Sequence, residues 1–216
     1  MNIFNISPAV LIPRLLALII SLTFHEYSHA WMAVKFGDET PRWAGRLTLN
    51  PLKHLDPIGS LTLLLVGFGW AKPVPVNPYT LKRKHPAALM AVALSGPLSN
   101  FILAVVTAIP LRFALVQPIG TTSSLLPSLF EFLLYFMYIN LGLMLFNLIP
   151  IPPLDGEEVL AFLLPAKAAM TYEKLRPYGS FILLGFILIG QFSGFNIINQ
   201  ILQPIMTGIA KFLLGV

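Results

Sequence analysis

Three polar residues at metal-binding spacing form the part of the sequence best suited to chemistry. His25 and His29 are four residues apart, and Glu26 directly follows the first of them. Residues i and i+4 lie on one face of a helix, so the two imidazoles can bind one metal ion. Glu26 lies about 100° round the helix from His25, beside the open coordination position. There its carboxylate can take a proton from a metal-activated water and pass it to a leaving amine.

The long apolar stretch around these residues makes a functional role for them more strongly indicated than their spacing alone would. Arg14 lies 11 residues before His25, and Lys35 lies ten residues after it. At about 1.5 Å per residue, the motif is therefore about 15 Å from either charged end. A charged residue at the centre of a bilayer costs about 3 kcal/mol, so membrane helices rarely carry such residues without a function. The H-E-x-x-H spacing is that of zinc metalloproteases.

A catalytic zinc site usually has three protein ligands and one open position, so a third ligand is needed. The extended pattern that ends in a third histidine is excluded, because it would need Gly and His where the chain has Met32 and Lys35. Asp38, Glu39 and Asp56 lie in a basic loop, where we expect them to be solvated. The remaining candidates are His54, His85, Glu131, Asp155, Glu157 and Glu158.

Asp155 is the third ligand that we favour. It follows the proline-rich stretch 150–153, which breaks a long apolar helix. Broken backbone at membrane depth is tolerated only inside protein or beside a wet cavity, which predicts an interior site. The alternative role is a cap at the start of a short helix over 155–164. Glu157 and Glu158 are expected to be first-turn acids of that helix, facing the cytoplasm.

Composition places these residues in a membrane protein. Of the 216 residues, 56% are hydrophobic and only 11% are charged, and the mean hydropathy is +0.78. Soluble domains carry about 25% charged residues. The chain has no cysteine, which excludes thiol catalysis, cysteine-ligated zinc, iron–sulfur clusters and disulfides. The net charge of +5 is attributed to basic loops beside the bilayer, and no nucleic-acid partner is expected.

Uncharged runs predict the helices that must position the site. A span needs about 20 mostly apolar residues. Five are predicted, over Pro8–Val34, Pro86–Leu111, Leu125 or Pro127–Ile149, and two helices in Pro177–Ala210 that are separated by a turn at Gln191–Asn196. Ile58–Ala71 is apolar but short, so we expect it to be re-entrant. The predicted fold is an all-α, polytopic helical bundle in the cell membrane.

The basic residues predict its orientation. If Ile58–Ala71 is re-entrant, 12 of the 14 Lys and Arg residues lie on one side, and only Arg14 and Arg112 lie on the other. Because basic loops face the cytoplasm, the N-terminus is predicted outside and the C-terminus in the cytoplasm.

Four motifs, in the same order along the chain, resemble those of the site-2 protease family of intramembrane zinc metalloproteases. They are His25–Ala30, Gly69–Asn77, Ser95–Asn100 and Asn147–Gly156. The resemblance covers about residues 15–160. It implies one zinc ion per chain and a membrane-spanning protein as substrate.

By this resemblance, His25, His29 and Asp155 bind the zinc ion, and Glu26 is the catalytic base. Asn147 matches a polar residue of the family motif, and its two roles are an oxyanion or substrate contact and an interhelical hydrogen bond.

Asn100 and the residues of the loop 72–80 have less specific roles. Asn100 either forms an interhelical hydrogen bond that holds the bundle together or supports the active site. The Pro/Val loop 72–80 is predicted to be a short extended or β segment. There Val74, Val76 and Asn77 are candidates for pairing with an unwound substrate strand.

The chain is expected to be one domain over 1–216, without a PDZ or CBS module. A C-terminal helical pair, at about 177–214, lies outside the strong resemblance. A homo-oligomer is left open. The alternatives to a protease are a membrane transporter and a catalytically inactive metal-binding scaffold, whereas a di-metal hydroxylase would need more than the four histidines present.

Overall fold

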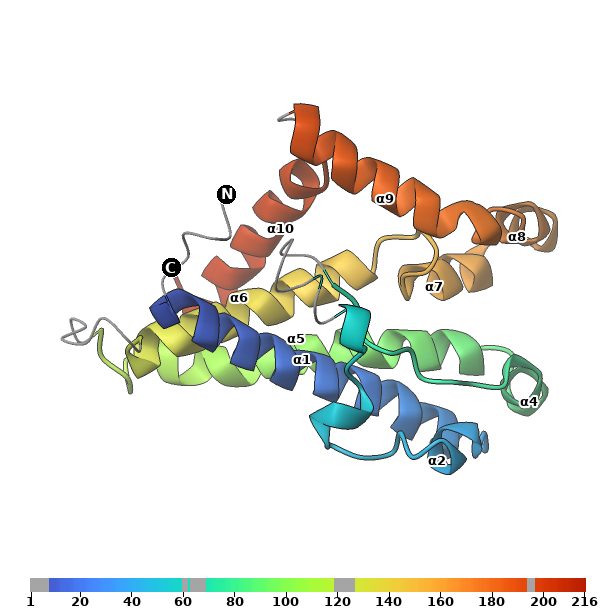
Figure 1. Cartoon of the computed structure of the whole chain (residues 1–216), viewed down its shortest axis with the longest axis horizontal. Helices are drawn as coiled ribbons and strands as arrows, with labels where there is room; N and C mark the ends of the chain where they lie inside the picture. The colour runs from blue at the N-terminus through green and yellow to red at the C-terminus, as the bar shows by residue number, and fades with distance from the viewer. Residues whose placement is uncertain (1–7, 60–61, 63–68, 119–126, 194–196) are drawn as a thin grey trace.

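The computed structural model describes residues 8–59, 62, 69–118, 127–193 and 197–216. Within them the regular elements are helical (Figure 1). In chain order they are α1 (Pro8–Lys35), α2 (Thr40–Trp43), the 3₁₀ helix η2 (Pro51–Lys53), α4 (Pro78–Lys84), α5 (Ala88–Arg112), α6 (Leu129–Asn147), α7 (Gly156–Leu163), α8 (Ala166–Glu173), α9 (Arg176–Ser193) and α10 (Ile197–Leu214).

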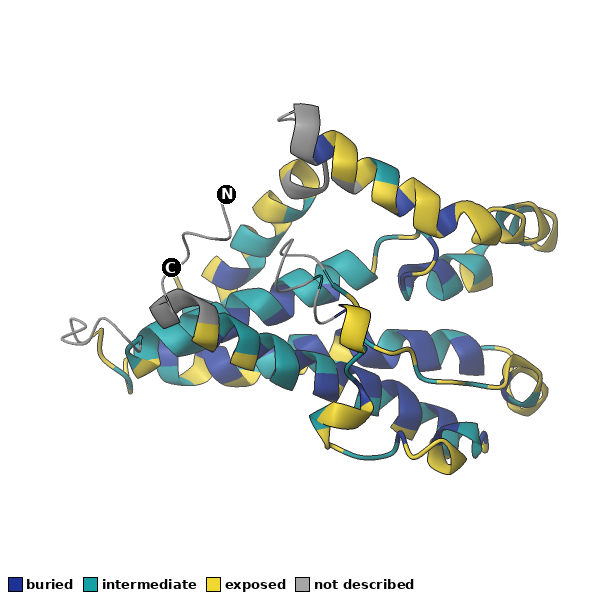
Figure 2. Ribbon diagram, viewed as in Figure 1, coloured by how far each residue is buried: buried dark blue, intermediate teal, exposed yellow. Residues whose placement is uncertain are grey.

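Three long helices form the central bundle. In Figure 1, α1, α5 and α6 lie side by side, and α10 packs against α5 and α6. The main apolar core lies among α5, α6 and α10, and its side chains are small or not β-branched, namely Ala104, Ala108, Leu111, Met137, Leu141, Met144 and Ala210. Small residues let membrane helices approach closely. Figure 2 shows burial concentrated in the central helices, whereas α9 presents mostly exposed residues.

The predicted helical fold is confirmed. The helices α1, α5, α6, α9 and α10 fall largely in the five predicted segments. The first half of the predicted turn at Gln191–Asn196 is instead helical, because α9 continues to Ser193, and residues 194–196 lie outside the described residues. By length and composition, α5 and α6 can each cross a membrane. The count of five spans stays a prediction. The proposed re-entrant segment Ile58–Ala71 lies mostly outside the described residues.

The predicted β segment does not form a strand. Residues 72–77 carry no regular element, and an isolated antiparallel bridge joins Leu55 to Ala71 just before them. Pro73 and Pro75 lack backbone N–H groups, so one edge of this segment has no donors for a neighbouring strand. It therefore lies beside the bundle as irregular chain between η2 and α4 (Figure 1).

The chain after α6 turns back toward the bundle. Gly156 allows this turn, because a Cβ atom there would lie 2.3 Å from the carbonyl oxygen of Leu148. The predicted helix over 155–164 is α7, which packs against α5. Asp155 occupies the N-cap position, but its side chain makes no capping hydrogen bond. The capping alternative is therefore wrong, and the carboxylate faces the bundle instead.

Two acidic residues expected in solvent are buried. Asp38 is 2% exposed, and its carboxylate accepts hydrogen bonds from the N–H and hydroxyl of Thr40 and from the N–H of Asn77. Glu157 is 8% exposed and pairs with Arg176 at the start of α9. Burial raises the pKa of the Glu157 carboxyl, and the Arg176 guanidinium opposes that rise. In both places a partner distant in sequence compensates for lost solvent.

Candidate metal centre and active site

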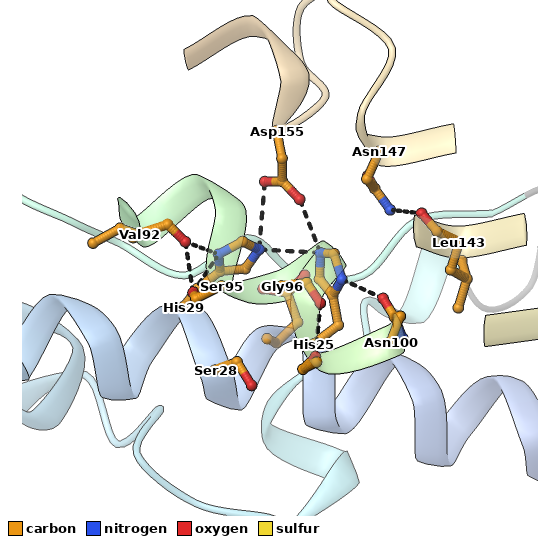
Figure 3. A network of polar contacts seen from close by, with 12 residues as sticks. His25, Ser28, His29, Val92, Ser95, Gly96, Asn100, Leu143, Asn147 and Asp155 are labelled. Atoms are coloured by element: carbon orange, nitrogen blue, oxygen red, sulfur yellow. Dashed lines mark hydrogen bonds and ion pairs between the residues drawn. The ribbon is translucent and has the colours of Figure 1, made fainter. Parts of the chain in front are cut away.

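Two histidines of α1 and one aspartate after α6 meet in the bundle (Figure 3). The Nε2 atoms of His25 and His29 are 3.0 Å apart. Asp155 places one carboxylate oxygen 3.2 Å from Nε2 of His25 and the other 3.4 Å from Nε2 of His29. Both histidines are buried, as expected for the interior of a membrane bundle. The structure thus brings the three predicted metal ligands into one group.

The second nitrogen of each imidazole fixes its tautomer. His25 donates from Nδ1 to the amide oxygen of Asn100 at 2.7 Å, and His29 donates from Nδ1 to the carbonyl oxygen of Val92 at 2.8 Å. The Asn100 amide nitrogen donates to Asn140 and to the carbonyl of Ser21, so its oxygen must face His25. Neutral imidazoles held in this way direct the lone pairs of both Nε2 atoms at the centre.

The donor set fits a zinc ion. Two nitrogen lone pairs and a carboxylate converge within 4.8 Å of one another, and one Asp155 oxygen is buried without a hydrogen-bond partner. A cation between these acceptors would compensate for their burial. Two histidines and one carboxylate are an established catalytic zinc set. Bonds of about 2.0–2.1 Å in a tetrahedron put ligand atoms roughly 3.3 Å apart, close to the separations here.

Gly96 of α5 leaves room for the imidazoles. A Cβ atom at this position would lie 2.4 Å from Nε2 of His29 and 2.6 Å from Cε1 of His25. The neighbouring Ser95 hydroxyl donates to the same Val92 carbonyl that holds His29. The small residues of the Ser95–Asn100 motif therefore let α5 approach the metal-binding face of α1.

Glu26 lies beside this group and is 9% exposed. One of its carboxylate oxygens is 3.7 Å from Nη2 of Arg46, a buried arginine of the loop after α2. Burial lowers the pKa of the Arg46 guanidinium, and the Glu26 carboxylate opposes that change. The arrangement places an acid–base group next to the candidate metal ligands.

Sequence reasoning missed Asn140, a fully buried residue of α6. Its amide oxygen accepts from Asn100 at 2.9 Å, and its amide nitrogen donates to the carbonyl of Phe136 at 2.8 Å. The path His25–Asn100–Asn140 therefore connects α1, α5 and α6 through hydrogen bonds. The signal was an amide in the middle of a largely apolar span, two helical turns before Asn147.

Among the described residues, the remaining predicted polar residues make no hydrogen bond to the metal group. Asn147 donates to the carbonyl of Leu143 on its own helix at 3.0 Å (Figure 3). Glu131 forms a capping box with Ser128 at the start of α6. His85 accepts from the N–H of Ala87 on the surface.

Residues 74–77 lie next to the helices that carry the site. Val76 packs against an apolar cluster that includes Ala33 of α1 and Val92 of α5, and Val92 is the residue that holds His29. Val74 is half-buried, and Asn77 caps α4 with its side chain. The backbone N–H groups of Val74 and Val76 have no hydrogen-bond partner among the described residues.

Comparison with known proteins finds a matching family model and several relatives that agree with the metal centre described above. The family model for peptidase family M50 matches residues 13–126 and 114–190. YwhC of Bacillus subtilis, described as a candidate zinc metalloprotease, is 38% identical over 220 residues, which cover 95% of this chain and all of YwhC.

Two more distant relatives carry the same description. MJ0611 of Methanocaldococcus jannaschii is 34% identical over 72% of this chain and 73% of its own length. Rip2 of Mycolicibacterium smegmatis is 32% identical over 66% of this chain and 53% of its own length. No solved structure matches the chain. The chain therefore belongs to peptidase family M50, the site-2 protease family, and is a membrane-embedded protease.

Proposed function

We propose that the chain is a zinc endopeptidase that hydrolyses peptide bonds of membrane-inserted proteins within the bilayer. The observation that carries the proposal is the convergence of His25, His29 and Asp155 beside the Glu26 carboxylate. In this site, His25, His29 and Asp155 hold one zinc ion. When bound, zinc supplies Lewis acidity, which makes water nucleophilic near neutral pH and polarises a carbonyl.

Glu26 acts as general base and then as general acid. It takes a proton from the water that attacks the scissile carbonyl, and it gives that proton to the leaving amine. Asn100 and the Val92 carbonyl keep His25 and His29 in the metal-binding tautomer through both steps. The reaction consumes one water and yields a carboxyl and an amino terminus.

The substrate is a membrane-spanning protein whose helix is locally unwound. A helix satisfies its own backbone hydrogen bonds, so an unwound segment needs new partners in the bilayer. Val74 and Val76 carry N–H groups that have no partner within the described part of the chain, and an extended peptide can pair with them as in strand addition. Asn147, at the end of α6, is proposed to contact the substrate or the developing oxyanion.

The protein is proposed to span the cell membrane five times, with the N-terminus outside and the C-terminus in the cytoplasm. Large apolar side chains of α9 and α10 are exposed, including Phe181, Leu188 and Ile201, which supports contact of these two helices with lipid.

The test is cleavage of single-span substrates in liposomes by the wild-type protein and by Glu26→Gln. The wild-type protein is expected to cut inside the apolar segment, with the bond identified by mass spectrometry. Glu26→Gln is expected to bind zinc and to cut at least 100-fold more slowly, because general acid–base catalysis contributes about 10²–10⁴-fold. Equal cleavage by both proteins would contradict the role of Glu26, and cleavage only in soluble tails would contradict intramembrane action.

A further inference from the structure

Arg46 connects the candidate catalytic base to the segment proposed to pair with substrate. The residue is 3% exposed and extends from the loop after α2. Its Nη1 donates to the carbonyl of Pro73 at 2.9 Å, and its Nη2 donates to the carbonyl of Lys72. The same Nη2 lies 3.7 Å from the carboxylate of Glu26. One guanidinium therefore contacts both parts of the proposed active site.

His54 supports Arg46 from the other side. Its Nε2 donates to the carbonyl of Thr48 at 2.7 Å, so its Nδ1 carries a lone pair, which faces Nη2 of Arg46 at 3.5 Å. The backbone of His54 also accepts a hydrogen bond from the N–H of Lys72 at 2.8 Å. The histidine lies in the turn after η2 and is fully buried.

Asp38 holds the other end of the same segment. Its carboxylate accepts from the N–H of Asn77 at 2.6 Å. Residues 72–77 are therefore anchored by charged side chains at both ends. Between the anchors, Val74 and Val76 keep the N–H groups that have no partner in the described part of the chain.

The Arg46 guanidinium makes more hydrogen bonds than neutralising the Glu26 carboxylate would require. A buried cation is costly unless its donors are paired. Here two donors are directed at the backbone of 72–73, and the planar fork of an arginine fixes the direction of both. Lysine would supply the charge without this fixed pair of bonds.

We propose that Arg46 is a positioning residue that sets the register of bound substrate relative to Glu26. By holding the carbonyls of Lys72 and Pro73, it fixes the edge formed by the N–H groups of Val74 and Val76 at a set distance from the catalytic carboxylate. This inference rests on the proposed function, since it needs substrate to pair with that edge. It concerns how substrate is aligned, whereas the zinc ligands and Glu26 concern the reaction itself.

The test compares wild-type protein, Arg46→Lys and Arg46→Ala in liposomes that contain one cleavable single-span substrate. Zinc content, kcat, KM and the cleaved bond are measured for each. Arg46→Lys is expected to keep the zinc and most of kcat, but to raise KM about 10-fold and to spread cleavage over neighbouring bonds. Arg46→Ala is expected to show the same shift of bonds with a lower kcat. Arg42→Ala is the matched control, because Arg42 of α2 is exposed and its ion pair is with Glu39 at the start of the same helix.

A structural role would give a different pattern. If activity falls only in proportion to folded, zinc-loaded protein, while KM and the cleaved bond stay unchanged, the positioning role is overturned. Unchanged kinetics and an unchanged bond in both variants would overturn it as well. The wild-type reaction separates the two proposals, because failure of the wild-type protein to cut within the span counts against the proposed function itself.

Discussion

At the scale of single residues, the hydrogen bonds behind the imidazoles decide what the metal centre can bind. Asn100 is fully buried and accepts from His25, and its own amide nitrogen is fixed by Asn140. Because such outer partners orient a metal-binding histidine and raise its basicity, their loss typically costs 10–100-fold in metal affinity. Asn100 is thus the residue that connects packing of the bundle to zinc affinity.

Asn100→Ala is expected to weaken zinc binding by about 10–100-fold, because His25 loses the acceptor for its Nδ1 proton. Competition with a zinc chelator in detergent measures the affinity. Asn147→Ala is the matched control, since Asn147 bonds only to its own helix among the described residues. Equal affinities for the two variants would show that Asn100 does not orient the ligand.

Gly96→Ala is expected to abolish zinc binding or to reduce it by more than 100-fold, because the new methyl group would overlap the His29 imidazole. Gly142→Ala in α6 is the control, since its nearest neighbour would be the Met206 sulfur at 3.9 Å. The zinc content after purification is compared between the two variants. A Gly96→Ala protein with full zinc content would mean that the histidines sit farther from α5.

The sequence was most informative where one helix carries the pattern. The spacing of His25, Glu26 and His29 predicted their shared site, because helix geometry alone brings them together. Arg46 and Asn140 could not be assigned in this way. Their partners are distant in sequence, and a lone buried arginine or asparagine has no spacing to read.

At the scale of elements, the chain after α6 carries Asp155 back to α1. Prolines end α6, which was visible in the sequence, and Gly156 permits the close return past Leu148. The ion pairs of Arg176 with Glu157 and Glu158 join α9 to the first turn of α7. The C-terminal helices thereby support the segment that holds a metal ligand. Local sequence patterns gave the lengths of these helices but not their mutual contacts.

Arg176→Gln is expected to destabilise the protein by about 1–3 kcal/mol, because the buried Glu157 carboxylate loses its cation. Thermal unfolding in detergent measures the change. Arg42→Gln is the control, since its ion pair with Glu39 is exposed and such pairs contribute about 0–1 kcal/mol. An effect of Arg176→Gln no larger than that of the control would contradict a supporting role for this link.

At the scale of the whole molecule, a metal ion would join parts that lie far apart in the chain. His25 and His29 belong to α1, whereas Asp155 follows α6. A ligand that binds only the folded state stabilises it by RT ln(1 + [L]/Kd). Zinc at about 100 times its Kd therefore contributes about 2.7 kcal/mol. The all-helical class was predictable from hydropathy, but the approach of α1, α5 and α7 depends on packing among distant segments.

Removal of zinc by chelation is expected to lower the unfolding temperature of the wild-type protein, and added zinc is expected to restore it. Asp155→Ala is expected to respond much less to either treatment, because one of three ligands is missing. Thermal scans in detergent with and without chelator provide the comparison. The same chelator response in both proteins would place the stabilising metal elsewhere.

The zinc content of the purified protein tests the central claim most directly. We expect about one zinc per chain in the wild-type protein and in Glu26→Gln, and a large loss in Asp155→Ala after the same dialysis. That result would assign the metal to His25, His29 and Asp155 and leave Glu26 free for proton transfer. Wild-type protein without zinc after metal add-back, or Asp155→Ala with undiminished zinc, would contradict the account.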